Sequence, residues 1–548
     1  MEDFIFGTLS TDQLKLNYLR TANSGIQHRY QMNPLDPQPG EGVTIQVETG
    51  PDVAVENMAG YFTLDGSQPD GSKGEAIVGE VVPFKRVSVE WDTLLWGYRS
   101  RWEAELPPQE VGTEVSYVIS AWGDAQEEIF ADWPDVKLTI EKMAKFYFDG
   151  QPLPDLAPLG DHASPQVFSY WVDKHQPPLW AKKAVIYHIF VDRFFPGQGR
   201  DWHQTEDLRE TFGGTLWGIA EKLDHIQALG ATAIWLSPIF PSPTIHRYDA
   251  TDYFRVSEGL GGDDALRNLI DQAHQKGIRI ILDLVCNHVS NEHPYFVEAQ
   301  GDVESPYRDW FFFNEEEAFG YRTFFGVPSM PQVNLNHPGA REWMLDAARY
   351  WINEFDIDGY RLDHATGPGP SFWGEFWRVC KQLKSDSICI GEVVEPPDIQ
   401  RQYYGRMDGL LDFHLCEAIR RTIGTKAWPE ARFASFLSGH QTSFPDDFLM
   451  ASFLDNHDMD RFSFIAGGDE DALKNAAALQ FQLPGPPVIY YGTEIGLKQK
   501  ISKTSAVGLE ASRGKMLWGD AQNKELFTFY QGVITERMKS KPWEQQST

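Results

Sequence analysis

The chain has few cysteines, and their positions exclude the common cysteine-based sites. Its 548 residues include four cysteines and no Cys-x-x-Cys pair, so zinc and dithiol redox motifs are not supported. Each lies in an apolar strand or helix pattern, which predicts buried free thiols and a reducing compartment. The four are Cys286, Cys380, Cys389 and Cys416.

Basic residues are scarce relative to acidic ones, and a long apolar segment is missing. Lysine and arginine number 48 against 79 aspartates and glutamates, a net charge of −31. Such a surface repels phosphate backbones, so we expect no nucleic-acid partner. No stretch is apolar enough to cross a bilayer, and Met1–Phe4 lacks the basic start and apolar run of a signal peptide. We therefore expect no membrane partner and a cytoplasmic protein.

The length and the pattern before residue 150 indicate more than one domain. A chain of 548 residues exceeds what one hydrophobic core usually organises. Short alternating segments at Val43–Glu48, Arg86–Trp91 and Glu114–Trp122 are separated by Gly-, Pro- and Asp-rich turns. This pattern predicts an antiparallel β-sandwich over residues 1–150, of a carbohydrate-binding or dimerisation type. The proline-containing stretch 151–178 is predicted to be a linker.

After Ala184 the chain alternates apolar strands with helical patterns. Eight such β-then-α units predict an α/β fold, a (β/α)8 TIM barrel over residues 179–542. The expected strands are Val185–Phe190, Ala231–Leu236, Ile278–Val285, Gly359–Leu362, Ile388–Gly391, Gly409–Phe413, Leu449–Leu454 and Val488–Tyr491.

One insertion, residues 289–338, follows the third strand and is rich in aromatic residues. A long loop at the carboxyl end of a barrel strand is where such folds build their sites. Its rings could equally form the small core of an inserted B domain, and both readings remain open.

Polar residues cluster at the carboxyl ends of the expected strands. Asp283, Arg361, Asp363, Glu392 and Asp458 are far apart in the sequence, but barrel geometry brings strand ends to one mouth. Any one acid could be a strand-end cap or half of a buried ion pair. Three of these acids, Asp363, Glu392 and Asp458, converging with Arg361 on one place favour a functional site, because buried charge is costly.

These residue types suit the cleavage of an acetal. Retaining hydrolysis needs an acid and a nucleophilic carboxylate roughly 5–5.5 Å apart, and adjacent strands are about 4.8 Å apart. Asp363 and Glu392 follow neighbouring strands, and Arg361 lies on the same strand face as Asp363. His288 and His457 could hydrogen-bond sugar hydroxyls, although a lone histidine is more often a satisfied core residue.

These segments resemble the short signature regions of the α-amylase family of glycoside hydrolases, over roughly residues 180–540. The four main matches are Asp283–His288, Gly359–His364, Gly391–Glu395 and Phe453–Asp458. Further matches are Phe212–Ile219, His246–Tyr253 and Pro487–Glu494. Met330–Asn334 is similar to a form typical of neopullulanases, cyclomaltodextrinases and maltogenic amylases.

The resemblance implies an activity and residue roles. The activity is retaining hydrolysis of α-glucosidic, mainly α-1,4, bonds in maltodextrins, cyclodextrins or pullulan through a covalent glycosyl-enzyme intermediate. Asp363 would be the nucleophile, Glu392 the general acid and base, and Asp458 the third catalytic carboxylate. Asp283 would be structural, tying the third strand to the site through Arg361 or neighbouring groups. The residues lining the same substrate subsite would be Tyr248, His288, Arg361 and His457.

Three departures from the family pattern limit the resemblance. His364 follows the nucleophile where a small or apolar residue is usual. The loop Phe195–Trp202 is poor in calcium ligands, and Asn287 alone is not a site, so no cofactor is expected to be required, with calcium possible but unsupported. The β-sandwich that usually follows the barrel is expected to be absent, because little follows the helix expected around Glu525–Met538.

Rival functions remain. A transglycosylase would use the same covalent intermediate, and the motifs do not separate the two outcomes. A non-catalytic carbohydrate-binding relative is disfavoured by the three retained carboxylates. The N-terminal sandwich could bind polysaccharide, or cover the cleft of a second subunit in a homodimer. The sequence leaves open α-1,4 against α-1,6 preference, substrate length and oligomeric state.

Overall fold

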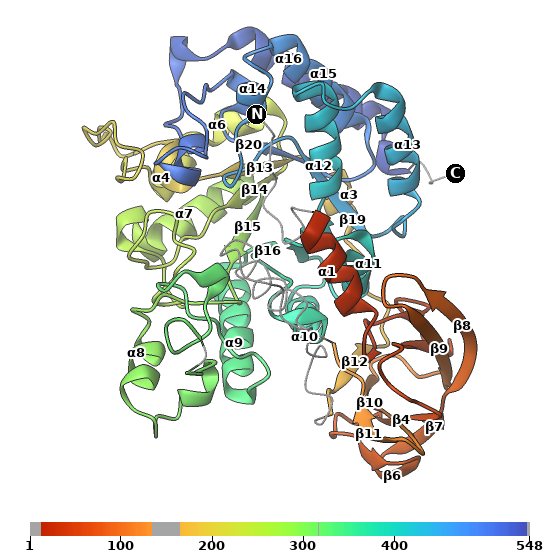
Figure 1. The fold of residues 1–548 in the computed structure, drawn as a ribbon. Coiled ribbons are helices and arrows are strands. Elements are labelled where there is room, and N and C mark those ends of the chain that lie inside the picture. The colour runs from red at the N-terminus through yellow and green to blue at the C-terminus, as the bar shows by residue number, and fades with distance from the viewer. Residues whose placement is uncertain (1–11, 134–164, 316, 545–548) are drawn as a thin grey trace. The chain divides into compact units, whose positions relative to one another are not determined.

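The structure is a computed structural model that describes residues 12–133, 165–315 and 317–544. The described residues fall into two compact units (Figure 1). One holds Gln176–Val393 and the described residues from Met407 onward; the other holds the described residues up to His175 together with Val394–Arg406. Most of the predicted linker, residues 151–164, lies outside the described residues, and within its remainder Phe168–Trp171 forms strand β12.

The first unit contains a closed barrel of eight parallel strands, which confirms the predicted fold class. Each strand pairs with the next, and β13 pairs with β20 to close the ring. The strands are β13 (Ile186–Ile189), β14 (Ala233–Leu236), β15 (Arg279–Leu284), β16 (Gly359–Leu362), β17 (Ile388–Gly391), β18 (Gly409–Leu411), β19 (Leu449–Phe453) and β20 (Pro487–Tyr490).

The barrel strands are short and almost entirely buried, as continuous apolar runs in a parallel sheet should be. The bounds of β16 and β17 match the prediction, and the ends of the other strands differ from it by at most two residues. The segment after β13 forms two consecutive helices, α5 (Leu216–Glu221) and α6 (Leu223–Leu229). Gly230 caps the second of these in the left-handed region, with φ 96°.

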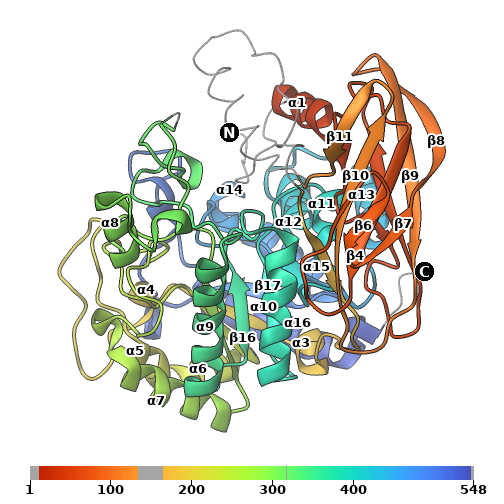
Figure 2. The same cartoon turned by 90° about the horizontal axis from the view of Figure 1, so that it is seen from below.

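Helices alternate with the strands around the barrel. Two of them, α9 and α10, pack against each other beside β16 (Figure 2). The main helices are α7 (Gly262–Gln275), α9 (Pro338–Phe355), α10 (Gly369–Leu383), α12 (Phe413–Ile419), α13 (Glu430–Gln441), α15 (Glu470–Gln482) and α16 (Lys524–Ser540).

The insertion after β15 contains α8 (Pro294–Gly301) and the short turns η2 (Arg308–Trp310) and η3 (Phe324–Gly326). Some aromatic rings of the insertion form a small core, and others lie at the barrel mouth, so both interpretations left open by the sequence apply. Phe296 packs within 5.0 Å of Phe311 and 4.9 Å of Tyr321, measured between ring centroids, as a small core. Phe324 instead packs beside residues of the barrel mouth, described below.

The second unit contains two antiparallel five-stranded sheets, consistent with the predicted β-sandwich. One sheet holds β1 (Ile26–Gln27), β2 (Met32–Asn33), β3 (Val43–Thr49), β8 (Lys85–Asp92) and β9 (Gly97–Leu106). The other holds β4 (Asn57–Thr63), β7 (Glu80–Pro83), β10 (Glu114–Gly123), β11 (Gln126–Phe130) and β12. Alternate residues of β3 are buried in a hydrophobic core that also includes Ile26 and Val172.

Two further expectations can be compared with the structure. All four cysteines are buried free thiols, as predicted. Among the described residues, no helix is both long enough and apolar enough to span a membrane.

Candidate active site

The parallel register of the barrel brings the predicted catalytic residues to one end. Asp283 and Arg361 are direct partners across β15 and β16. One position further along, the amide of Asp363 donates to Leu284 O at 3.0 Å, and that of Glu392 donates to Leu362 O at 2.9 Å. The strands therefore place Asp363 and Glu392 side by side just beyond the ends of β16 and β17.

Arg361 joins three carboxylates. Its Nη1 donates to Asp363 Oδ1 at 2.7 Å and to Asp283 Oδ1 at 2.9 Å, and its Nη2 is 2.8 Å from Glu392 Oε2. The guanidinium is almost fully buried. Arg361 thus contacts both Asp283 and Asp363. The Glu392 carboxylate also accepts from the amide of His364 at 3.0 Å.

The charges of this cluster do not balance, since one cation faces three acids. Burial raises the pKa of Asp363 well above its usual range, and the neighbouring Glu392 and Asp283 raise it further against the opposing effect of Arg361. Burial also raises the pKa of Asp283 to about 6, again opposed by Arg361. Burial therefore favours the protonated forms of Asp363 and Asp283, and the Arg361 guanidinium opposes that effect at both.

Asp283 is held by two further donors. Trp235 Nε1 donates to its Oδ2 at 3.0 Å and the Tyr248 hydroxyl donates to the same oxygen at 2.9 Å. The Tyr248 ring in turn lies parallel to the His457 ring, with 5.1 Å between their centroids. The structure thus brings Tyr248 and His457 together and links both to the Arg361 cluster.

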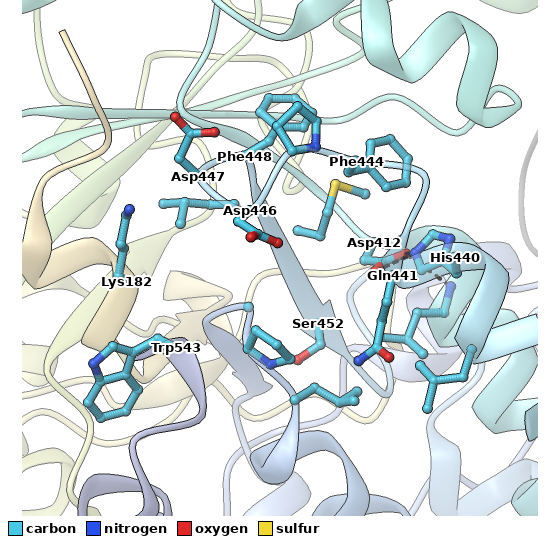
Figure 3. A pocket seen from close by; sticks show the side chains of 18 of the residues that line it. Lys182, Asp412, His440, Gln441, Phe444, Asp446, Asp447, Phe448, Ser452 and Trp543 are labelled. Carbon is cyan, nitrogen blue, oxygen red and sulfur yellow. Dashed lines mark hydrogen bonds and ion pairs between the residues drawn. The ribbon is translucent and has the colours of Figure 1, made fainter. Parts of the chain in front are cut away.

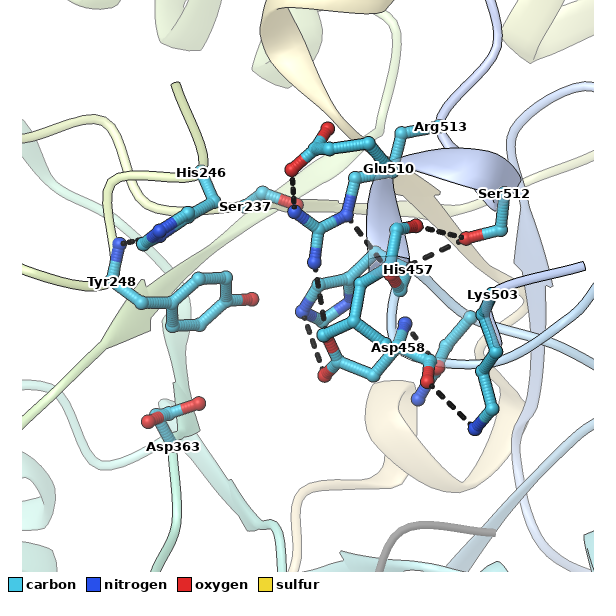
Figure 4. Close-up of polar contacts among 12 residues, drawn as sticks. Ser237, His246, Tyr248, Asp363, His457, Asp458, Lys503, Glu510, Ser512 and Arg513 are labelled. Carbon is cyan, nitrogen blue, oxygen red and sulfur yellow. Dashed lines mark hydrogen bonds and ion pairs between the residues drawn. The ribbon is translucent and has the colours of Figure 1, made fainter. Parts of the chain in front are cut away.

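Asp458 and His457 lie in the segment that follows β19. His457 Nε2 is 3.1 Å from Asp458 Oδ2, and Asp458 Oδ1 is 3.1 Å from Arg513 Nη2 (Figure 4). Burial lowers the pKa of His457 well below its usual range, and the nearby Arg513 and Arg361 lower it further. His457 is therefore neutral at pH 7 and can exchange hydrogen bonds with a hydroxyl group.

His288 lies on the side of the mouth formed by the insertion. Its ring stacks on Phe324 with 4.5 Å between centroids, and Phe324 meets the ring of His364 edge-on at 5.0 Å. His364 follows the predicted nucleophile and has a left-handed backbone, with φ 42°. That conformation aims its amide at Glu392 and its ring at the insertion.

Several residues at this site had not been identified from the sequence. Trp235 could have been found as a donor-bearing side chain inside an apolar strand. Arg513, Glu510 and Lys503 could not, because their segment has neither periodicity nor a strand end to mark it. Lys503 Nζ donates to the Asp458 carbonyl at 3.3 Å.

Two other features of the described residues bear on ligands. No group of three or more histidine, cysteine or acidic side chains among them is arranged to hold a metal ion. A cavity of about 240 Å³ opens beside β19, lined in part by Phe444, Phe448 and the His440–Asp412 ion pair of 2.9 Å (Figure 3). None of the predicted site residues lines it.

A closed parallel barrel with paired carboxylates at its mouth defines a class, the barrel glycoside hydrolases. Residues 188–528 match the family described as "Alpha amylase, catalytic domain". The chain belongs to the α-amylase family of glycoside hydrolases.

Individual relatives resemble the chain over its barrel. Alpha-amylase 2 of Dictyoglomus thermophilum is 40% identical over 374 residues, which are 68% of this chain and 66% of the relative. A cyclomaltodextrinase of a Bacillus species is 36% identical over 67% of each chain. The match thus spans about two thirds of these relatives. A solved structure titled "Cyclomaltodextrinase" has a TM-score of 0.63 and 29% identity, covering 94% of this chain and 84% of that one.

Proposed function

We propose that the protein hydrolyses α-glucosidic, mainly α-1,4, bonds in maltodextrins, cyclodextrins or pullulan with retention of configuration. The observation that carries the proposal is the shared guanidinium, because Arg361 contacts Asp363 at 2.7 Å and Glu392 at 2.8 Å. A nucleophile and an acid held on one rigid cation are adjacent, as a retaining mechanism needs.

Each residue has a stated role. Asp363 attacks the anomeric carbon while Glu392 protonates the leaving oxygen, and a glycosyl ester forms on Asp363. Glu392 then takes a proton from a water molecule while the oxygen of that water attacks the anomeric carbon. The ester bond to Asp363 breaks, and Asp363 leaves as a carboxylate. Asp458 and His457 bind hydroxyls of the distorted ring, the Tyr248 ring lies against the sugar, and His288 binds from the side of the insertion.

Trapping the intermediate tests the mechanism. Glu392→Gln treated with α-maltosyl fluoride should gain the mass of one maltosyl group on the peptide that contains Asp363, because a good leaving group needs no acid but ester hydrolysis needs the base. Asp363→Asn is the matched control and should gain none. A first product with inverted configuration, seen by proton NMR, would refute retention.

The substrate is proposed from the named relatives and from the Met330–Asn334 segment. Product analysis on maltotriose, γ-cyclodextrin, pullulan and soluble starch under one set of conditions tests it. Accumulation of products longer than the substrate would favour the alternative, a transglycosylase that passes the same intermediate to another sugar. No turnover of any of the four would favour a non-catalytic carbohydrate-binding relative.

The remaining parts of the proposal concern the setting of the enzyme. We propose a cytoplasmic protein that needs no metal cofactor, with the 1–150 sandwich serving carbohydrate binding or homodimer formation. Full activity after dialysis against EDTA, and sedimentation of the whole chain at several concentrations, test the last two points.

A further inference from the structure

One buried arginine outside the predicted site contacts the third carboxylate. Arg513 follows the turn η7 (Gly508–Ser512), beyond the last barrel strand, and its side chain is only 3% exposed. Its Nη2 is 3.1 Å from Asp458 Oδ1, and its Nη1 is 2.5 Å from Glu510 Oε1 (Figure 4). Its Nε donates to the His457 carbonyl at 2.9 Å. Three of the five N–H groups of the guanidinium are thus committed around Asp458.

Arg513 holds both the side-chain carboxylate of Asp458 and the backbone carbonyl of the preceding residue, His457. Arg513 Nη2 donates to Oδ1, whereas His457 Nε2 lies 3.1 Å from Oδ2 without hydrogen-bond geometry, so Arg513 is the contact that directs the carboxylate. The hydrogen bond from Arg513 Nε holds the carbonyl of His457, one residue before Asp458. A planar guanidinium that grips a side chain and the adjacent backbone restricts rotation far more than a single ammonium would.

Glu510 completes the arrangement by orienting the arginine. It pairs with Arg513 at 2.5 Å and lies 3.6 Å from Arg193 Nη2, so its own position is set from a second direction. Asp458 itself is less enclosed, with 28% of its side chain exposed, which leaves it accessible to a sugar. Arg513 and Glu510 are therefore held in the interior, whereas Asp458 remains partly open to solvent.

The same cation affects the neighbouring histidines. Burial lowers the pKa of His246 to about 3, and Arg513 is the next cause. Arg513 also contributes to the lowered pKa of His457. Both rings are neutral at pH 7, so neither adds a positive charge beside Asp458.

We propose that Arg513 is a positioning residue, which with Glu510 aims the Asp458 carboxylate at the ring hydroxyls of the bound sugar. This inference rests on the proposed function, because it acts through Asp458. It makes the segment after η7 part of the machinery of the barrel mouth.

The test is a double-mutant cycle. Arg513→Met should lower kcat/KM by roughly 10²-fold, the usual scale for losing one preorganised electrostatic contact, with most of the loss in kcat. In an Asp458→Asn background the same change should cost less than about threefold, since the group through which Arg513 acts is gone. Arg513→Lys should recover part of kcat, because it keeps the charge but loses the fork.

Arg537→Met is the matched control. Arg537 is also buried, and donates to the carbonyls of Leu483 at 2.5 Å and Gly485 at 2.9 Å, just before β20 and away from the strand ends that carry the site. It should lose stability as Arg513→Met does, while keeping kcat in the folded fraction. If Arg513→Met does not fold, Glu510→Gln replaces it, with an expected fall in kcat of about tenfold that also vanishes in the Asp458→Asn background.

The outcomes separate this inference from the proposed function. If Asp458→Asn is inactive but the folded Arg513 variant retains kcat within threefold, the positioning role is wrong and the proposed function stands. Equal losses from Arg513→Met in both backgrounds would likewise refute it, since the effect would not pass through Asp458. If Asp458→Asn keeps wild-type activity, the role of Asp458 in the proposed function is wrong as well.

Discussion

At the scale of single residues, the site depends on how few cations serve its acids. Arg361 contacts Asp283, Asp363 and Glu392, and Arg513 contacts Asp458 and Glu510. Arg361 faces more carboxylates than it can neutralise, whereas Glu510 is shared between Arg513 and Arg193. The excess negative charge favours a retained proton and, on the proposed mechanism, a transition state with positive character at the anomeric carbon.

Removal of the nucleophile gives the first prediction. Asp363→Asn should lower kcat by at least roughly three orders of magnitude, because the amide is nearly the same size but cannot form the ester. Stability to heat should change little, since Arg361 keeps its other two carboxylate partners. Activity within tenfold of wild type, measured on a purified and folded variant, would contradict the assignment.

The second prediction concerns the acidic limb of the pH profile of activity. Asp363 must be ionised to attack, and its pKa is raised by burial and then by Glu392 and Asp283. Activity should therefore fall with decreasing pH at a higher pH than an ordinary aspartate, near 3.9, would give. Asp283→Asn removes one neighbouring negative charge, which should move this limb of the kcat/KM profile to lower pH.

The control for that shift is a buried aspartate far from the site. Asp358 pairs with Arg279 at 2.7 Å and Lys384 at 3.0 Å, next to the start of β16. Asp358→Asn should destabilise the protein without moving the acidic limb. A limb that moves equally in both variants, or that Asp283→Asn moves to higher pH, would argue against the electrostatic origin.

At the scale of elements, the turn after β16 is the most constrained part of the mouth. His364 has φ 42°, in the region that non-glycine residues seldom adopt. A Cβ on Gly367 would lie only 1.8 Å from Asn287 Oδ1 and 3.2 Å from the His364 ring. The turn after β16 and the segment after β15 therefore interlock through a position where only glycine fits.

This close approach gives the third prediction. Gly367→Ala should displace Asn287, and with it the neighbouring His288, lowering stability by about 1–3 kcal/mol and reducing kcat/KM. Thermal unfolding and kinetics on one substrate measure both effects. Gly439→Ala is the matched control, because Gly439 lies inside α13 with open space around its Cβ position, and alanine there should stabilise by about 0.5–1 kcal/mol. Equal stability of the two variants would contradict the interlock.

At the scale of the whole molecule, the strongly acidic chain of 548 residues carries a barrel and two five-stranded antiparallel sheets. A neutral oligosaccharide is not repelled by this charge, and the insertion adds apolar rings at the mouth. The fourth prediction is a higher kcat/KM on cyclodextrins or short maltooligosaccharides than on soluble starch. Its motives are the additional sandwich, the Met330–Asn334 segment and the cyclomaltodextrinase relatives.

Kinetics on the full chain and on a variant beginning near Pro178 would test that prediction. If the sandwich restricts access, the full chain should prefer the short or cyclic substrates, and the shortened chain, if folded, should lose that preference. A full chain that prefers starch would contradict the prediction, as would a folded barrel with unchanged preference.

Sequence alone determined the barrel and the polar residues at its strand ends. Apolar runs such as Ile388–Gly391, repeated eight times in alternation with helical patterns, favour buried parallel strands, and the position of Glu392 just after one of them follows from chain order. Because equivalent strand ends of a barrel meet at one rim, chain order alone groups Asp363, Glu392 and Asp458.

Only the tertiary structure decided what surrounds those residues. Arg513 and Glu510 come from a segment without regular periodicity, so nothing local marks their approach to Asp458. The break between α5 and α6, the left-handed turn at His364 and the division of the insertion's rings between its core and the mouth are also tertiary. In each case the deciding interaction joins segments distant in sequence, and local patterns carry no information about such contacts.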